Sequence, residues 1–452
     1  MNNIRSLLTL LIILPAFAAH AQSLQELFSL ASRQSQQIQV SRTELKAASE
    51  AVSAARSAML PNVDLSLSGS YIGNATLMTR GFSTSGTSDV IVAGLGPQQV
   101  PNGKQNTPHW GNTFSAQASQ VIYAGGAISA GIRLAEMGEQ MAALDVEKNQ
   151  QEVRFLIAGY YLDLCKIQNQ QEVIRQNIDL TQQVISDMQA RMEQGTVLQN
   201  DITRYELQLK NLELTQSKLQ DAAAIINFQL ANTLHLETGT VVTIDREGLD
   251  AELASLKAIA SHDLWQQTAQ ENNIGLKQAA LASDMAEQKI KTTRAASLPS
   301  VALVAGDDLF GPYTNDLIPV NANVNAWFVS LGVKYNLGSL WHNKHNIRKA
   351  KREQQKAGEQ FALAQEGVRN GVQANYVSFL TAFTEVSTQE KQVELAMQNY
   401  SVVENRYKNE LALLTDMLDA SQMKLSSDMD LVNARITLLY NYYRLKYTTG
   451  TL

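Results

Sequence analysis

Two carboxylates stand three residues apart near the start of a segment with a helical pattern. Asp416 and Asp419 can project from nearly one face of such a helix, because side chains at positions i and i+3 are neighbours. One interpretation is helix capping, with Asp416 as the N-cap and Asp419 favoured by the positive helix end, as Asn200-Asp201 would do earlier in the chain. The other is electrostatic: like charges repel by roughly 4 kcal/mol at ~4 Å and an effective dielectric of about 20, so such carboxylates must hold cations, share protons or stay apart. The two roles can coexist.

Residue patterns typical of enzymes are poor. His342 and His345 have a spacing that could touch a metal, but no cysteine or third histidine stands near them. Gly125-Gly126 follows a strand-like segment but lacks the further glycine and the lysine of a phosphate loop. Cys165, the single cysteine, is best interpreted as a small buried apolar residue. We therefore predict that the chain is not an enzyme and has no metal site or cofactor.

The N-terminus and the composition restrict where the protein works. Residues 1–21 combine Arg5, an apolar run from Leu7 to Phe17 and the small residues of Ala19-His20-Ala21, which predicts a secretory signal peptide. No later apolar run reaches the roughly 20 residues of a membrane-spanning helix. A net charge of −6 provides no basic footprint for nucleic acid. If the mature chain spans a membrane, it must do so with strands.

Alternating apolar and polar residues predict two pairs of strands. They are expected from Val63 to Tyr71, Phe114 to Tyr123, Val301 to Ala305 and Trp327 to Leu337. Period-two alternation gives each strand one apolar and one polar face. Such strands suit an outer-membrane barrel, and also a small soluble sheet packed on helices. Because about eight strands are the practical minimum for a barrel, a barrel would require several chains.

Two long segments are free of proline and carry heptad repeats. No proline lies between Pro108 and Pro299 or after Pro319, so uninterrupted helices are possible there. A helix from Ala127 to Gln194 would be on the order of 100 Å long at about 1.5 Å per residue. Apolar residues recur at seven-residue intervals, which indicates coiled-coil packing, in the series Ile178, Ile185, Met192, then Tyr205, Leu212, Leu219, Ile226, and later Val372, Phe379, Val386, Val393, Tyr400, Tyr407.

The chain carries an internal two-fold repeat. The segment Met59 to Val63 returns as Ser297 to Val301, and Arg191 with Asp201 returns as Arg406 with Asp416 at the same internal spacing. A repeat of this kind means that one structural unit is used twice. The expected organisation is a signal peptide (1–21), then repeat one (22–260, with a strand pair 62–123, a surface loop 72–113, a helical hairpin 127–234 and a connector 235–260), then repeat two (261–452, with a strand pair 299–337, a loop 307–324 and a hairpin 342–447).

This order of elements resembles the TolC family of outer-membrane efflux and secretion ducts, over essentially the whole mature chain. The most specific shared pieces are Tyr123-Ala124-Gly125-Gly126, Asn336-Leu337-Gly338, Arg406-Tyr407 followed by Asp416 to Ala420, and the closing Tyr440 to Leu452. The resemblance implies a mixed α/β membrane protein with four strands per chain. In a homotrimer these strands would form one twelve-stranded outer-membrane β-barrel, continued by a coiled-coil barrel of long antiparallel helices. Glu410, where the family usually has glycine, and the long 72–113 loop depart from the pattern.

The resemblance also assigns roles near the two hairpin turns. Two aspartates would form carboxylate rings at the periplasmic mouth of the duct. Four further side chains would form weak polar links that keep the mouth closed. The ring residues are Asp416 and Asp419, and the link residues are Arg406 and Tyr407 with Asp201 and Thr196 across from them. Tyr407 can also be interpreted simply as the end of the heptad seam.

We therefore predict a passive trimeric duct in the outer membrane, with a periplasmic extension, for efflux of small molecules or type I export. The expected partners are two further copies of the chain, a periplasmic adaptor, an inner-membrane transporter and outer-membrane lipid, with nucleic acid excluded. The alternative is a periplasmic coiled-coil adaptor or structural protein with a soluble sheet. Aromatic residues near strand ends favour the membrane because they suit interfacial girdles: Tyr71, Trp110, Phe114, Tyr123, Trp327 and Tyr335.

Overall fold

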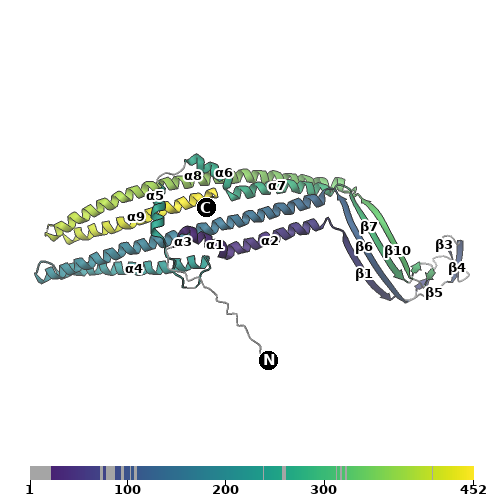
Figure 1. Ribbon diagram of the computed structural model, residues 1–452, viewed down its shortest axis with the longest axis horizontal. Helices are drawn as coiled ribbons and strands as arrows, with labels where there is room; N and C mark the ends of the chain where they lie inside the picture. Colours follow the sequence, from purple (N-terminus) through teal and green to yellow (C-terminus); the bar gives the residue numbers. More distant parts are fainter. Residues whose placement is uncertain are drawn as a thin grey trace, which may run out of the picture. The chain divides into compact units, whose positions relative to one another are not determined.

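The computed structural model describes most of the chain after the predicted signal peptide (Figure 1). The described residues are 22–71, 75–77, 87–92, 96–101, 103–105, 109–237, 239–256, 261–311, 313–315, 318–320, 323–409 and 411–452. The predicted signal peptide, Glu410 and much of the predicted 72–113 loop lie outside them. In the described parts of the predicted loop the structure has short strands at Ala75–Leu77, Thr87–Val92, Gly96–Pro101 and Gly103–Gln105, and a longer strand already begins at Trp110.

Helices make up most of the described chain. They are α1 (Leu24–Gln34), α2 (Gln36–Ser57), α3 (Ala127–Glu193), α4 (Gln199–Thr233), α5 (Arg246–Ser255), α6 (His262–Asn272), α7 (Ile274–Ala295), α8 (Ser339–Lys408) and α9 (Leu414–Thr449). The strands are β1 (Asn62–Tyr71), β2 (Ala75–Leu77), β3 (Thr87–Val92), β4 (Gly96–Pro101), β5 (Gly103–Gln105), β6 (Trp110–Ala124), β7 (Ser300–Gly311), β8 (Tyr313–Asn315), β9 (Ile318–Val320) and β10 (Val324–Lys334). Among the described helices, none is long and apolar enough to cross a membrane.

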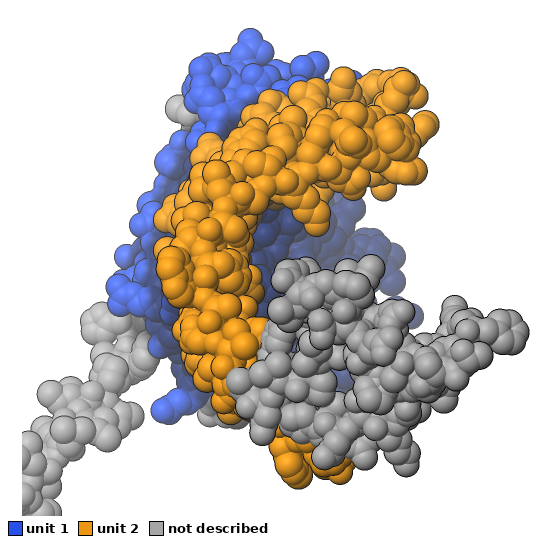
Figure 2. Space-filling view, turned by 90° about the vertical axis from the view of Figure 1, so that its right-hand side faces the viewer, with its two compact units in different colours: residues 1–46, 140–281, 359–452 blue, residues 47–139, 282–358 orange. Residues whose placement is uncertain are grey.

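The chain forms two compact units (Figure 2). Unit 1 consists of residues 1–46, 140–281 and 359–452, and unit 2 of residues 47–139 and 282–358. The boundaries fall within α2, α3, α7 and α8, so each of these helices contributes residues to both units.

Unit 2 contains a four-stranded antiparallel sheet with the strand order β1-β6-β7-β10, and shorter strands form the antiparallel pairs β2-β5, β3-β4 and β8-β9. The register of the four-stranded sheet places Leu65 opposite Ala116 and Leu303 opposite Leu331. The apolar residues of the predicted alternation are exposed along the two outer strands: Val63, Leu65 and Leu67 on β1, and Trp327, Val329, Leu331 and Val333 on β10. The predicted fold class, mainly helical with four strands that form one sheet, is confirmed. Within this sheet β1 and β10 are edge strands, whose outer backbone groups lack a strand partner.

The strand β7 extends further than predicted. The sequence predicted a loop from Asp307, but β7 runs to Gly311. Asp307 to Phe310 belong to the strand because they pair with β10. The neighbouring Asp308 is accommodated because the Ser115 hydroxyl donates a hydrogen bond to its carboxylate. The last residue of β10 is Lys334, so the predicted strand end at Leu337 was also wrong.

Close contacts join the helices of unit 2 where they meet the sheet. Gly125, between β6 and α3, has φ +63°, and a Cβ there would lie 2.7 Å from the carbonyl oxygen of Ala295 at the end of α7. Asn343 on α8 donates from Nδ2 to the carbonyl oxygen of Thr293 on α7 at 2.6 Å and to Ser297 Oγ at 2.7 Å. The ends of α7 and α8 are therefore fixed by both polar and steric contacts.

The core of unit 1 follows the predicted heptads. Val372 and Phe379 on α8 and Tyr205 and Leu212 on α4 are buried, as are Ile178 and Ile185 on α3. The largest apolar cluster joins α3 to α1, α5 and α9, with Ile157 and Tyr161 among its fully buried side chains. A smaller cluster occupies the tips of the two helical hairpins, α3–α4 and α8–α9.

A short connector between the repeats is held by side-chain contacts with the backbone. Asn227 on α4 donates to the carbonyl oxygen of Thr240 and accepts from the Val242 amide, each at 2.8 Å. Ile244 then forms a parallel bridge with Gln22. One amide side chain therefore satisfies two backbone groups of this segment.

Candidate functional site

The candidate site lies at the tips of the two helical hairpins of unit 1 (Figure 1). The tip cluster is an apolar core contributed by both hairpins, with the buried residues Ile185, Met188, Ile202, Tyr205, Tyr400, Met417 and Ala420. Tyr407, the last residue of the predicted heptad seam, packs against it while half-buried. All six residues predicted from the sequence lie in the two turns or in the adjoining helical turns.

The predicted N-cap role of Asp416 was wrong. Leu413 has the extended N-cap conformation, with φ −77° and ψ 155°, and α9 begins at the next residue. Asp416 is therefore the third helical residue, and its carboxylate Oδ2 accepts a hydrogen bond from the Leu413 amide at 3.1 Å. Asp419 follows one turn later, exposed and without a hydrogen bond or ion pair among the described residues. Both carboxylates are thus available on one side of the helix start.

Asp201 has the same position in the first hairpin. Leu198 is the N-cap residue of α4 and has an extended backbone, and the helix begins at Gln199. The Asp201 amide donates to the Leu198 carbonyl oxygen at 2.9 Å. The corresponding bond from Asp416 to Leu413 measures 3.1 Å. The predicted capping by Asn200-Asp201 was therefore wrong for the same reason: both residues lie inside the first helical turn. A carboxylate there is still favoured by the positive helix end.

Thr196 and Arg406 stabilise their own turns. The Thr196 hydroxyl donates to the Arg191 carbonyl oxygen at 3.1 Å, and the Arg406 guanidinium donates from Nη2 to the Leu411 carbonyl oxygen at 3.3 Å. Both side chains are exposed. Among the described residues, the structure shows no contact from Arg406 to Asp201 or Thr196.

Arg191 makes the contact between the hairpins that was expected of Arg406. Its Nη2 donates to the Lys408 carbonyl oxygen at 3.1 Å, and its Cζ lies 6.0 Å from the centre of the Tyr407 ring. Burial raises the pKa of Tyr407, the Arg191 charge lowers it, and the Asp201 carboxylate raises it. Tyr407 therefore lies close to both residues of the other hairpin. The sequence could have indicated this role for Arg191, because the internal repeat aligns Arg191 with Arg406.

Two tyrosines of the tip cluster have buried hydroxyl groups without a hydrogen-bond partner among the described residues, Tyr205 and Tyr400. Burial raises the pKa of Tyr400 to about 12, and the Glu404 carboxylate adds to the shift. Burial also raises the pKa of Tyr205, with a further contribution from Tyr400. Both hydroxyls are therefore neutral at physiological pH.

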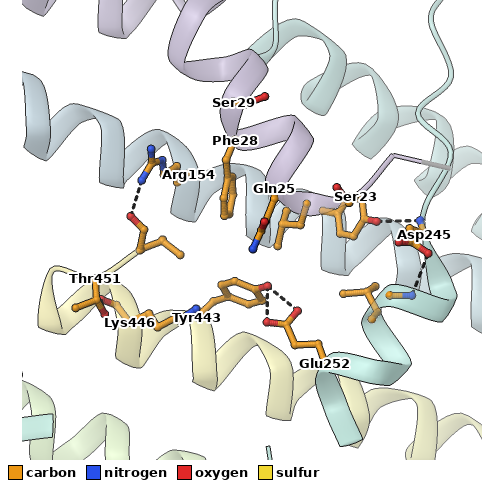
Figure 3. A pocket seen from close by; sticks show the side chains of 15 residues that line it. Ser23, Gln25, Phe28, Ser29, Arg154, Asp245, Glu252, Tyr443, Lys446 and Thr451 are labelled. Carbon is orange, nitrogen blue, oxygen red and sulfur yellow. Dashed lines mark hydrogen bonds between the residues drawn. The ribbon is translucent and has the colours of Figure 1, made fainter. Parts of the chain in front are cut away.

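A separate cavity of about 670 Å³ lies in unit 1 between α1, the connector and the end of α9 (Figure 3). Glu252 accepts hydrogen bonds from the Tyr443 hydroxyl at 2.7 and 2.8 Å, and Arg154 donates to the Leu452 carbonyl oxygen at 2.8 Å. Asp245 accepts from the Gly248 amide at 3.0 Å. These hydrogen bonds engage the charged side chains of Arg154, Asp245 and Glu252 and connect chain segments that line the cavity.

The other residues with possible chemistry lie apart from the tips. Cys165 is buried in the core of unit 1, where burial raises the pKa of its thiol. His342 and His345 are exposed on α8 in unit 2. Within the described ranges, no group of three or more His, Cys, Asp or Glu residues could hold a metal ion.

The chain thus combines two long helical hairpins with a four-stranded antiparallel sheet. Residues 27–234 and 265–451 match the family model described as outer membrane efflux protein, and the chain belongs to this family. It is therefore an outer-membrane protein, and the predicted resemblance is confirmed. Because the family is one of efflux proteins, the prediction that the chain is not an enzyme is confirmed as well.

Individual relatives are distant in sequence. The outer membrane protein TolC of Salmonella enteritidis is 24% identical over 304 residues, which cover 64% of this chain and 57% of that protein. The match thus spans less than two thirds of this relative. The crystal structure of VceC from Vibrio cholerae has a TM-score of 0.72 at 16% identity and covers 94% of this chain and 96% of its own. CusC has a TM-score of 0.75 at 13% identity, with 95% and 92% covered. These two structures show the fold.

Proposed function

We propose that three copies of the chain form a passive duct through the outer membrane. The observation that carries the proposal is the sheet of unit 2, with its two open edges, β1 and β10, and its exposed apolar series. In lipid every backbone polar group needs a partner, so β10 of one copy would pair with β1 of the next until twelve strands close a barrel. Family membership favours this duct over a periplasmic adaptor or structural protein.

The tips of unit 1 would form the periplasmic entrance. Three leucines at the two turns are strongly exposed, Leu198 at 72%, Leu411 at 68% and Leu413 at 70%. Apolar side chains gathered on an exposed surface support docking of another protein, here a periplasmic adaptor that connects the duct to an inner-membrane transporter. The cargo would be small molecules or exported polypeptides, with selectivity set by charge along the lumen.

The proposal is tested by the native mass of the protein extracted with detergent from separated outer membranes. We expect three times the mass of one chain. A periplasmic monomer or dimer would contradict the duct and support the adaptor alternative.

Replacing Arg191 by alanine should favour the open duct. The variant loses the hydrogen bond to the Lys408 carbonyl oxygen and the contact with the Tyr407 ring. One such exposed link is worth about 1 kcal/mol, so the open-to-closed ratio should rise roughly fivefold per chain. Resting conductance of single trimers in planar bilayers measures this rise.

Arg406→Ser is the matched control for Arg191→Ala. It also removes one exposed guanidinium, but the contact that it removes lies within a single turn. We expect a smaller rise in conductance than for Arg191→Ala. An equal or larger rise would show that the link between the hairpins is not what keeps the entrance closed.

A further inference from the structure

The first five turns of α8 carry an unbalanced cluster of positive charge. Residues 339–358 contain six lysines or arginines and one acidic residue, Glu353. The matching segment of the first repeat, residues 127–146, contains one basic residue, Arg133, and three acidic residues. Both segments begin a long helix directly after a strand. The fold therefore does not require the positive charge, which needs a separate explanation.

The basic residues share one side of the helix. At 100° per residue they lie within about half of its circumference, together with Trp341. The other side includes the buried residues Asn343 and Ala350. We call this surface the basic face of α8, and it consists of the exposed residues Lys344, Arg348, Lys349, Lys351, Arg352 and Lys356.

Much of this charge is not compensated. Lys349 forms an ion pair with Glu353 at 3.7 Å, and Arg352 donates to the Gln355 side chain at 2.8 Å. Lys344, Arg348 and Lys351 make no hydrogen bond or ion pair within the part of the chain that the structure describes. In the first repeat, by contrast, Arg133 pairs with Glu136 at 3.3 Å. Uncompensated like charges on one face favour an anionic partner.

The basic face begins close to the end of the sheet. Strand β10 ends at Lys334 and α8 begins at Ser339, so at 1.5 Å per residue Lys344 lies about 8 Å and Arg348 about 14 Å along the helix. The exposed aromatic residues Tyr335 and Trp341 lie between the end of β10 and Lys344 in the chain. Such residues are enriched where a membrane meets water.

We propose that the basic face of α8 binds the head groups of anionic phospholipids at the periplasmic surface of the outer membrane. The proposal rests on the proposed function, which places the sheet in the membrane. Each basic residue near an anionic surface strengthens binding about fivefold. The effect falls off over a Debye length of about 8 Å, so Lys344 and Arg348 contribute more than Lys356.

Native mass spectrometry of the detergent-solubilised protein, titrated with phosphatidylglycerol or with phosphatidylcholine of the same acyl chains, tests the proposal. The wild type should bind phosphatidylglycerol about tenfold more tightly or better. The variant Lys344→Gln/Arg348→Gln/Lys351→Gln should bind the two lipids within about twofold of each other. The control Arg204→Gln/Lys218→Gln/Arg369→Gln removes the same charge from exposed positions in unit 1 and should keep the wild-type preference.

Three results would overturn the proposal: a wild type without preference, a Lys344/Arg348/Lys351 variant that keeps it, or an equal loss in the control. The reversal potential of the same variants in a salt gradient adds a further readout. A shift in reversal potential with unchanged lipid preference would assign the basic face to the lumen instead. The spectra also report the number of chains, so a monomer would contradict the proposed function whether or not the lipid preference is present.

Discussion

Replacing Asp416 and Asp419 by asparagine is expected to weaken block of the duct by trivalent cations about a hundredfold. Three chains would bring six of these exposed carboxylates to the entrance. At about 0.5 kcal/mol for each exposed carboxylate, their loss removes ~3 kcal/mol of cation binding. Asparagine keeps an oxygen that can accept the hydrogen bond from the Leu413 amide, so the turn should be preserved. Current through single trimers, recorded against cation concentration, measures the change.

The matched control for this pair lies further along the same helix. Asp428→Asn/Asp430→Asn removes the same charge from α9, where Asp428 pairs with Lys424 at 3.4 Å. We expect block of this variant to stay within about threefold of the wild type, since removal of a screened, distant charge has little effect. Equal weakening in both variants would mean that overall charge, and not a carboxylate ring, binds the cation. Unchanged block in Asp416→Asn/Asp419→Asn would remove these residues from the pore.

Gly125→Ala is expected to destabilise the protein by roughly 3 kcal/mol or more. Its left-handed backbone, with φ +63°, costs a residue with a Cβ about 1–2 kcal/mol. The added Cβ would also lie 2.7 Å from the Ala295 carbonyl oxygen and from Leu298 Cβ, and overpacking of this kind typically costs 1–3 kcal/mol. The temperature at which the trimer dissociates should fall, as followed by gel electrophoresis after heating.

The variant Gly126→Ala separates the cost of the left-handed backbone from the cost of the steric contact. Gly126 has φ +83°, but the nearest atom to an added Cβ, Ser129 Oγ, is 4.0 Å away. This variant should show the backbone cost without the steric one, and a smaller fall in dissociation temperature. Equal falls would show that the close approach to the end of α7 contributes nothing to stability.

The helical core could be predicted from the sequence because heptads report burial directly. Val372, Phe379 and Tyr400 belong to one series with a seven-residue period and are buried in the structure. The end of β7 was harder to predict, because Asp307 and Asp308 resemble loop residues. Their place in the strand depends on a partner strand and on Ser115, which is distant in the sequence.

The details of the candidate site depended on backbone conformation and on contacts between hairpins. An aspartate near a helix start can be the N-cap or the third helical residue, and the extended conformation of Leu413 decided between them for Asp416. The repeat made Arg191 and Arg406 equivalent in sequence. Only the packing of the two hairpins distinguishes the arginine that reaches across, Arg191, from the one that bonds within its own turn.

If the tips form the proposed entrance, the hydroxyls of Tyr205 and Tyr400, which have no hydrogen-bond partner among the described residues, would make its closed state less stable than the apolar packing suggests. A buried hydroxyl without a partner costs about 1–3 kcal/mol relative to one in contact with water. If the hairpins separated, water would reach both groups, and this free energy would be recovered while apolar contacts were lost. The two effects oppose each other, so the free-energy difference between the closed and the open entrance would be small. Binding of an adaptor would then need to supply only this small free-energy difference to open the entrance.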